Sequence, residues 1–543
     1  MADRFIISTI LIDGEALGPS FALLGIDVTR AVNRIPVAVI FVQAPGPVLS
    51  ETPLMAGGPF TPAAEVEIKL RSEDGKEVSI FKGVVTGLAV HTRDGVPTLE
   101  ATVKDKAIRL AGARHSKIWA DTADAEAIQG LVEAATLTFG DPPDTQPVHK
   151  ALVQYESTDW DFILSRADAL SLVAVVQDGT ISLKKMDPGA AATRTFSLGF
   201  DTITDIHFEL DAATQSSSLS GLVWDPDQLA AAEPADAAVL ELPQGKIAGA
   251  MVGEALGVGP MHATHMVPLP AAEAKAWASS RMARARLALI RGRISVPGLP
   301  SVQPMEIAKL EGFGDRFSGS VLITGVRHRL DSQGYSTDLE FGLSPDPIGR
   351  LPEIAPMAAA GLVPPISDLQ VGVVQDGEDP DKQGRVQVTV PAIQTEQPGL
   401  LWARVASADA GDQRGVCFMP EAGDEVLVGF LAGDPRYPVV LGRLHGSKNA
   451  LPDDFKDRKK KGIVTRRKAS LVFSEADKPS ITISTPGGRT VVLDDDGEAI
   501  TISDQNNNTI TLDAKGISIE SGKDLILKAA GAVKITGSTI DLN

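Results

Sequence analysis

The sequence has almost no cysteine: Cys417 is the single one among 543 residues. One cysteine cannot form a disulfide within the chain, and there is no cysteine cluster to bind zinc. Aromatic residues are scarce at 5%, whereas glycine (51) and proline (36) are abundant. This composition favours β-rich domains joined by turns over a helical bundle. Cys417 lies in an apolar strand pattern, which predicts a buried small side chain.

Long apolar runs and an excess of positive charge are missing too. No run approaches the roughly 20 apolar residues that span a bilayer. The apolar stretch Phe5–Ile12 is interrupted by Ser8 and Thr9, and it lacks the longer core and cleavage site of a signal peptide. The formal net charge of −19 argues against a broad surface for nucleic acid or anionic membrane. We therefore expect synthesis in the cytoplasm without a signal peptide, and no nucleic-acid partner.

Residues 1–350 mix short strands with helices. The alternation of Glu65–Leu70 predicts a strand. Apolar spacing predicts helices at Ala123–Leu137, from Ser157 to about Leu172, and at about Ala271–Ile290. The last helix is rich in arginine, which we interpret as a solvated face.

The remainder of the chain reads as a barrel between two linkers, followed by a repeat. Short strands separated by Gly, Pro and Asp predict a barrel of about five strands, with Val416–Met419 among the candidates. The expected segments are 1–200 and 201–350, a Pro/Ala-rich linker 351–368, the barrel 369–450, a basic linker 451–468, and the repeat 469–543.

The repeat consists of short apolar pairs, such as Ile481/Ile483 and Ile510/Leu512, that recur every 7 to 10 residues. Period-two alternation places each pair on one face of a strand and Thr, Ser, Lys or Asp on the other. Units this short cannot bury their own apolar face. We therefore expect a homotrimer in which three chains each form one side of a stiff prism, with strand edges paired between chains. We interpret Asp494–Asp496 as a turn rather than a calcium loop.

Several segments carry recognisable motifs in a fixed order. Ser157–Leu164 (STDWDFIL) and residues 317–341 come first, followed by Gly384–Val388 (GRVQV), Trp402–Val405 (WARV) and residues 420–445. Together they resemble the VgrG family, the spike and hub proteins of contractile injection systems. The amino-acid sequence around the barrel is most similar to spike proteins of extracellular phage-tail-like injection systems. Type VI secretion spikes and phage baseplate hub-spike proteins come next.

The resemblance implies a mainly β fold with some α: hub domains of the baseplate-hub type, an OB-fold barrel and a C-terminal triangular, intertwined trimeric β-helix. It implies a structural trimer that caps an inner tube, meets baseplate proteins and pierces the target membrane during contraction. A PAAR-type tip protein would bind Ile540, Asp541, Leu542 and Asn543. Effector cargo, if there is any, would bind non-covalently or be carried elsewhere. The chain would be assembled into an injection particle that is extracellular or delivered to the target cell on firing.

We nominate no catalytic, cofactor-binding or metal-binding residues. His262 and His265 are spaced like a ligand pair but lack the HExxH arrangement. His328 and His445 are interpreted as packed or surface residues. Two alternative functions stay open. A β-helical envelope-degrading enzyme would usually have a longer solenoid with a charged groove, and a trimeric tail fibre or adhesin would normally end in a globular receptor-binding head.

Overall fold

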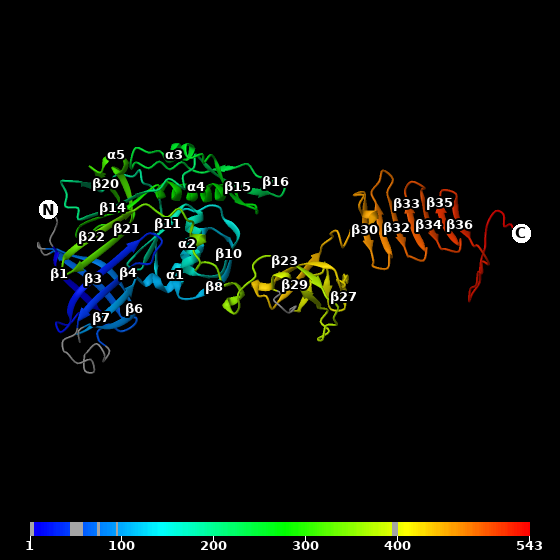
Figure 1. The fold of residues 1–543 in the computed structure, drawn as a ribbon, viewed down its shortest axis with the longest axis horizontal. Coiled ribbons are helices and arrows are strands. Elements are labelled where there is room, and N and C mark those ends of the chain that lie inside the picture. The colour runs from blue at the N-terminus through cyan, green and yellow to red at the C-terminus, as the bar shows by residue number, and fades with distance from the viewer. Residues whose placement is uncertain (1–4, 44–57, 73–75, 94–95, 394–399, 543) are drawn as a thin grey trace. The chain divides into compact units, whose positions relative to one another are not determined.

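The structure is a computed structural model that describes residues 5–43, 58–72, 76–93, 96–393 and 400–542. It contains two compact units, Met1–Pro356 and Met357–Asn543. Strands predominate in both, and the α-helices of the described residues lie in the first unit (Figure 1). The mainly β fold class expected from composition is confirmed.

A 13-stranded sheet forms the centre of the first unit. Its strands are β1 (Phe5–Ile12), β2 (Glu15–Ala16), β3 (Ala22–Ala31), β4 (Val37–Gln43), β5 (Glu65–Ser72), β6 (Glu77–Arg93), β7 (Val96–Lys104), β13 (Arg194–Ser197), β14 (Asp205–Leu210), β19 (Ile290–Pro297), β20 (Ile307–Glu311), β21 (Gly319–Asp331) and β22 (Gly334–Phe341). In β5 the alternation predicted from sequence buries Val66, Ile68 and Leu70 in the core. Because β21 pairs with β3, strands from both halves of the unit share this sheet.

Smaller sheets and helices surround the large sheet. The strands are β8 (Arg114–Thr122), β9 (Thr138–Gly140), β10 (His149–Thr158), β11 (Leu172–Gln177), β12 (Thr180–Lys185), β15 (Leu219–Asp225), β16 (Ala230–Ala231), β17 (Ala235–Asp236) and β18 (Met261–His265). The helices are α1 (Asp124–Ala134), α2 (Asp159–Ala169), α3 (Gly249–Ala255), α4 (Ala271–Ala288) and α5 (Gly314–Phe317). The three predicted helices are thus confirmed as α1, α2 and α4. Thr158 is the N-cap of α2, and its hydroxyl accepts a hydrogen bond from the Asp161 amide.

The prediction of a solvated arginine face on α4 is wrong. Arg284 is 4% exposed, and its Nε lies 2.6 Å from Asp168 Oδ1 on α2. Arg286 is also buried and donates to the side chain of Gln215 and the backbone oxygen of Ser216. Helix α4 packs against α2 and against β15, so Arg284 and Arg286 are enclosed and each requires a partner, whereas Arg281 is half-buried.

A second buried ion network joins three helices. The Asp124 side chain on α1 is fully buried and accepts a 2.5 Å hydrogen bond from Arg166 on α2. Arg166 also donates to Glu273 on α4 at 3.0 Å, and His149 lies 2.9 Å from Asp124. Burial alone would lower the pKa of Arg166, but its bonds to the two carboxylates outweigh that effect and raise it. These pairs fix α1, α2 and α4 to one another.

The second unit begins with a closed barrel of five strands, which confirms the prediction. They are β23 (Gln370–Val374), β24 (Val386–Thr389), β25 (Leu401–Val405), β28 (Glu425–Phe430) and β29 (Pro438–Arg443). The prediction that Val416–Met419 is a strand with Cys417 buried is wrong, because the segment has no strand pairing and Cys417 is exposed. It follows the small hairpin of β26 (Ala410–Gly411) and β27 (Arg414–Gly415), outside the ring of strands that closes the barrel.

Seven antiparallel strands then form one sheet: β30 (Lys460–Val464), β31 (Ser470–Ser474), β32 (Ser480–Ser484), β33 (Thr490–Asp494), β34 (Ala499–Ser503), β35 (Thr509–Asp513) and β36 (Gly516–Glu520). Each strand pairs with its neighbour in sequence. The expected edge pairing between chains is therefore wrong for these strands. Short turns bring consecutive strands side by side, so their backbone groups are satisfied within one chain. β30 lies inside the segment expected to be a linker.

Candidate functional site

Two rows of apolar side chains cover one face of the β30–β36 sheet. Directly paired residues form each row: Ile463, Leu471, Ile483, Val491, Ile502, Ile510 and Ile519 in one, and Phe473, Ile481, Leu493, Ile500, Leu512 and Ile517 in the other. Ile483, Ile502 and Ile519 are 48%, 44% and 53% exposed. A hollow of about 670 Å³ lies on this face. In a single chain this surface has no covering layer, which is typical of an interface rather than a finished core.

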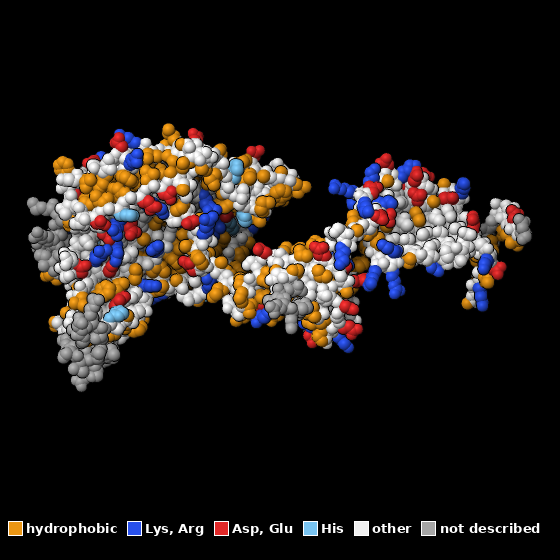
Figure 2. All heavy atoms as spheres, in the orientation of Figure 1, with side chains coloured by type: hydrophobic (Ala, Val, Ile, Leu, Met, Phe, Trp, Pro, Cys, Tyr) orange, Lys and Arg blue, Asp and Glu red, His pale blue; other side chains and the backbone are white. Residues whose placement is uncertain are grey.

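The opposite face of the same sheet is polar. Its central row consists of Val472, Thr482, Val492, Thr501, Thr511 and Ser518, so four of these six side chains are polar. Figure 2 shows the C-terminal sheet with few hydrophobic side chains on the visible surface and charged ones at its turns. The two faces therefore differ sharply, as the period-two alternation predicts.

Aspartates hold the turns between these strands. Asp504 accepts hydrogen bonds from the backbone and side-chain nitrogens of Asn508 and from the Asn506 amide. These bonds, led by the Asn508 side chain, lower the pKa of Asp504 to about 2. Asp494 likewise accepts from the Asp496 amide at 3.0 Å, and residues 495–498 form a turn. The turn interpretation of Asp494–Asp496 is confirmed.

Beyond Glu520 the described residues form no strand. The apolar alternation nevertheless continues, and Leu525, Leu527 and Ile535 are 56%, 66% and 63% exposed. Among the predicted tip-binding residues, Ile540 is 50% exposed, Leu542 is 90% exposed and Asp541 is exposed. Asn543 lies outside the described residues. Among the described residues, these alternating side chains have no strand partner and lie exposed.

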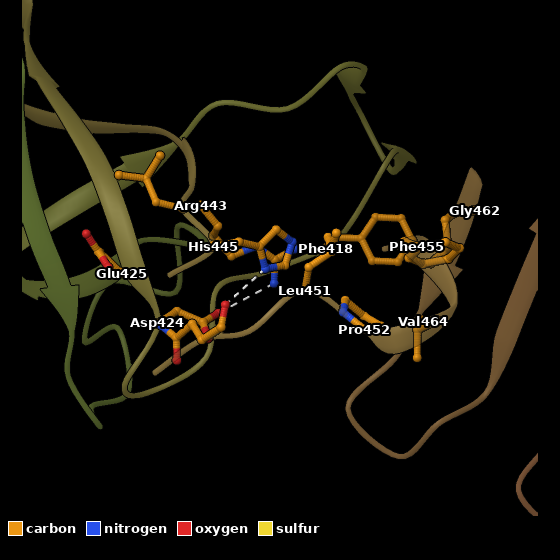
Figure 3. A pocket seen from close by; sticks show the side chains of 13 residues that line it. Phe418, Asp424, Glu425, Arg443, His445, Leu451, Pro452, Phe455, Gly462 and Val464 are labelled. Carbon is orange, nitrogen blue, oxygen red and sulfur yellow. Dashed lines mark hydrogen bonds and ion pairs between the residues drawn. The ribbon is translucent and has the colours of Figure 1, made fainter. Parts of the chain in front are cut away.

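A cavity of about 560 Å³ lies where the barrel meets the first strand of the sheet (Figure 3). Figure 3 shows Asp424, Glu425 and Arg443 on the barrel side and Pro452, Phe455 and Val464 on the other, with Phe418, His445 and Leu451 between them. Sequence reasoning missed this site and the start of the apolar rows. The signal was present, because Ile463, Leu471 and Phe473 continue the alternation recognised further along the chain.

The histidines considered as ligands have other environments. His262 Nδ1 lies 2.7 Å from Ser220 Oγ on the neighbouring strand β15. His328 is buried, with Nδ1 2.9 Å from the Tyr335 hydroxyl, and burial lowers its pKa to about 3. His445 is exposed. Within the described residues, no group of three or more His, Cys, Asp or Glu side chains is placed to hold a metal ion.

Across the described ranges, no helix is both long enough and apolar enough to cross a bilayer.

A closed barrel followed by a single-layer sheet with one bare apolar face is an architecture suited to a spike built from several chains. Residues 370–445 match the type VI secretion system/phage-baseplate injector OB domain, and residues 480–543 match the phage baseplate V C-terminal trimerisation domain. The Alg8 N-terminal domain matches residues 2–332, more than half of the chain. The chain therefore belongs to the Alg8 N-terminal domain family, and it is a VgrG-like spike protein.

Individual relatives share shorter segments. The type VI secretion system spike protein VgrG3 of Vibrio cholerae is 37% identical over 87 residues, which is 16% of this chain and 9% of that protein. VgrG1c of Pseudomonas aeruginosa is 30% identical over 143 residues, 24% of this chain and 20% of that protein. The matched segments thus span about a fifth or less of these curated relatives.

Solved structures of similar chains come from phage tails and secretion systems. The prophage MuSo2 43 kDa tail protein of Shewanella oneidensis has a TM-score of 0.47 and 11% identity, covering 62% of this chain and 98% of that one. An E. coli type VI secretion component similar to T4 tail proteins has a TM-score of 0.39 and 13% identity, covering 80% of this chain and 99% of that one.

Proposed function

We propose that three copies of this chain form the structural hub and spike of a contractile injection system. The observation that carries this proposal is the pair of apolar rows on the bare face of the β30–β36 sheet. Three such faces turned toward one axis would bury the rows together. At roughly 25 cal/mol per Å² of apolar surface, this burial contributes on the order of tens of kcal/mol before ordering entropy is subtracted. The result is a stiff, thin shaft.

The N-terminal unit is proposed to cap the inner tube and contact baseplate proteins. In this arrangement residues 1–200 and 201–350 act as two hub domains, followed by a linker at 351–368, the barrel at 369–450 and the spike at 469–543, whose sheet already begins with β30 inside the segment 451–468. The buried pairs that fix α1, α2 and α4 support the role, because they stiffen the unit against axial load. Extracellular injection systems remain our preferred setting over type VI secretion and phage tails.

A PAAR-type tip protein is proposed to bind residues Ile540–Asn543. The exposed Leu542 supplies an apolar anchor for such a contact. Deleting these four residues should abolish co-purification with a PAAR-type protein while the trimer persists. Retained binding after the deletion would show that the tip contact lies elsewhere.

We also propose that the chain itself catalyses no reaction and that effector cargo binds non-covalently. The relatives VgrG3 and VgrG1c are named spike proteins, whereas a further V. cholerae relative, VgrG1, is named an actin cross-linking toxin. The purified chain should leave peptidoglycan and acidic polysaccharides intact. Degradation of either substrate would favour the alternative of an envelope-degrading enzyme.

The test of the central proposal is the mass of the purified, unheated protein by light scattering. A mass near three times 57.0 kDa is expected. The trimer should also resist SDS, because the prism cannot open without exposing all of its apolar rows at once. A monomer under all assembly conditions would contradict the spike.

A further inference from the structure

The apolar rows of the C-terminal sheet continue into the barrel junction. Ile463 on β30 pairs directly with Leu471 and is the first member of its row. The same side chain lines the 560 Å³ cavity beside the barrel. The face expected to meet other copies of the chain therefore does not stop at the end of the sheet but opens into this cavity.

The wall of the cavity carries other apolar side chains that are uncovered in a single chain. Phe418 and Leu451 are 50% and 37% exposed, and Ile463 itself is 41% exposed. Phe418 belongs to the segment that leaves the barrel without strand partners, and its neighbours Val416 and Met419 are 46% and 43% exposed. Exposed apolar side chains therefore extend from the sheet, along part of the cavity wall, to Phe418 and its neighbours beside the barrel. Surfaces of this kind, rimmed by polar groups, mark protein interfaces.

The rim of the cavity is polar and internally paired. Arg443 lies 3.5 Å from Asp424, and His445 Nδ1 lies 3.2 Å from the Asn449 backbone oxygen. The Asn449 side chain in turn donates to the Gly423 backbone oxygen at 3.3 Å. Because these rim groups already have partners, an occupant needs to supply mainly apolar contacts.

We propose that a second copy of the chain occupies this cavity, so that the trimer interface includes the junction between barrel and sheet. This inference rests on the proposed trimeric spike and extends its interface beyond the segment that matches the trimerisation domain, which begins at residue 480. The argument for this occupant is continuity, since Ile463 belongs both to the apolar row and to the cavity wall. In the trimer, a neighbouring copy then fills the space between the barrel and the sheet of one chain. Axial force is therefore transmitted through packed side chains at this junction.

The only cysteine of the chain provides a native probe of this joint. Cys417 is exposed in a single chain and directly precedes Phe418 in the cavity wall. In the intact trimer we expect its thiol to react with a maleimide about tenfold or more slowly than in urea-unfolded protein. Phe418→Lys would place a charge in the occupied cavity, so it should raise the thiol rate toward the unfolded value. Thr482→Lys, on the polar face of the sheet, is the matched control and should leave the rate unchanged.

The outcomes separate this inference from the function on which it rests. A trimeric mass with slow Cys417 labelling that Phe418→Lys accelerates supports the inference. A trimeric mass with Cys417 labelled at the unfolded rate overturns the junction interface but leaves the spike intact. Slow labelling unaffected by Phe418→Lys also overturns it, because the protection then arises within one chain. A monomeric wild-type protein overturns both proposals.

Discussion

Replacing Ile502 by aspartate should prevent trimer formation. Ile502 lies near the middle of one apolar row, between Val491 and Ile510 on the neighbouring strands. It is 44% exposed in the single chain, so a substantial part of its side chain is still available for burial by partner copies. By symmetry, the substitution would place three carboxylates close to one axis.

The magnitude follows from burial and charge. Burying the remaining Ile502 surface is worth about 1 kcal/mol per chain, given 1.5–3 kcal/mol for a fully buried side chain. The aspartate loses this contribution and adds an effective desolvation penalty of several kcal/mol per ion. Summed over three chains, Ile502→Asp should weaken the trimer by roughly 10 kcal/mol or more. Association at micromolar concentration would not survive such a loss.

Light scattering of the variant should give a mass near 57.0 kDa instead of three times that value. Thr501→Asp is the matched control, because Thr501 lies next to Ile502 in sequence on the opposite face of the same strand. It should stay trimeric. Protonation removes the introduced charge, so the Ile502→Asp trimer should partly recover as the pH falls toward about 4. A trimeric Ile502→Asp at neutral pH, or a monomeric Thr501→Asp, would refute the assignment of the two faces.

Three predictions concern the first unit, each measured by thermal or urea unfolding. His328 has a folded pKa of about 3, below the usual value near 6.5, so the unfolded chain binds the proton first. The contribution of neutral His328 to the free energy of unfolding is therefore present in full above pH 6.5 and decreases as the pH falls toward 3. At pH 4.5 the free energy of unfolding should be about 3 kcal/mol lower than at neutral pH, and this loss should be absent in His328→Asn. An equal loss in the wild-type protein and in His328→Asn would contradict this role of His328. Arg284→Met removes the positive partner of Asp168 and should cost about 3–5 kcal/mol. Adding Asp168→Asn removes the charge but keeps an acceptor for Ser280 and the Ile348 amide, so it should restore part of the loss. In Gly298→Ala the new Cβ would lie 1.6 Å from the Tyr335 ring, so a loss of about 1–3 kcal/mol is expected, and unchanged stability would mean that the ring moves freely.

The helices, the barrel and the C-terminal strands were predictable because each depends on local pattern. Apolar spacing fixed the positions of α1, α2 and α4 to within a few residues, and turn residues marked the barrel strands. The environment of a residue outside a regular pattern was not predictable in this way. The run of apolar residues at Val416–Met419 indicated a buried strand, but the barrel closes without this segment and Cys417 is exposed.

Sequence by itself determined that the C-terminal repeat needs other chains, because each short unit carries more apolar surface than one layer of strands can bury. Only the tertiary structure decided how the strands pair within one chain, why the arginines of α4 are buried, and where the apolar rows meet the barrel. These outcomes depend on which segments, distant in the chain, pack against each residue. Arg284 meets Asp168 because α2 and α4 are brought together, and Ile463 and Phe418 line one cavity because β30 folds beside the barrel. Local alternation can specify a face, but the partner of that face is set by the packing of the whole molecule.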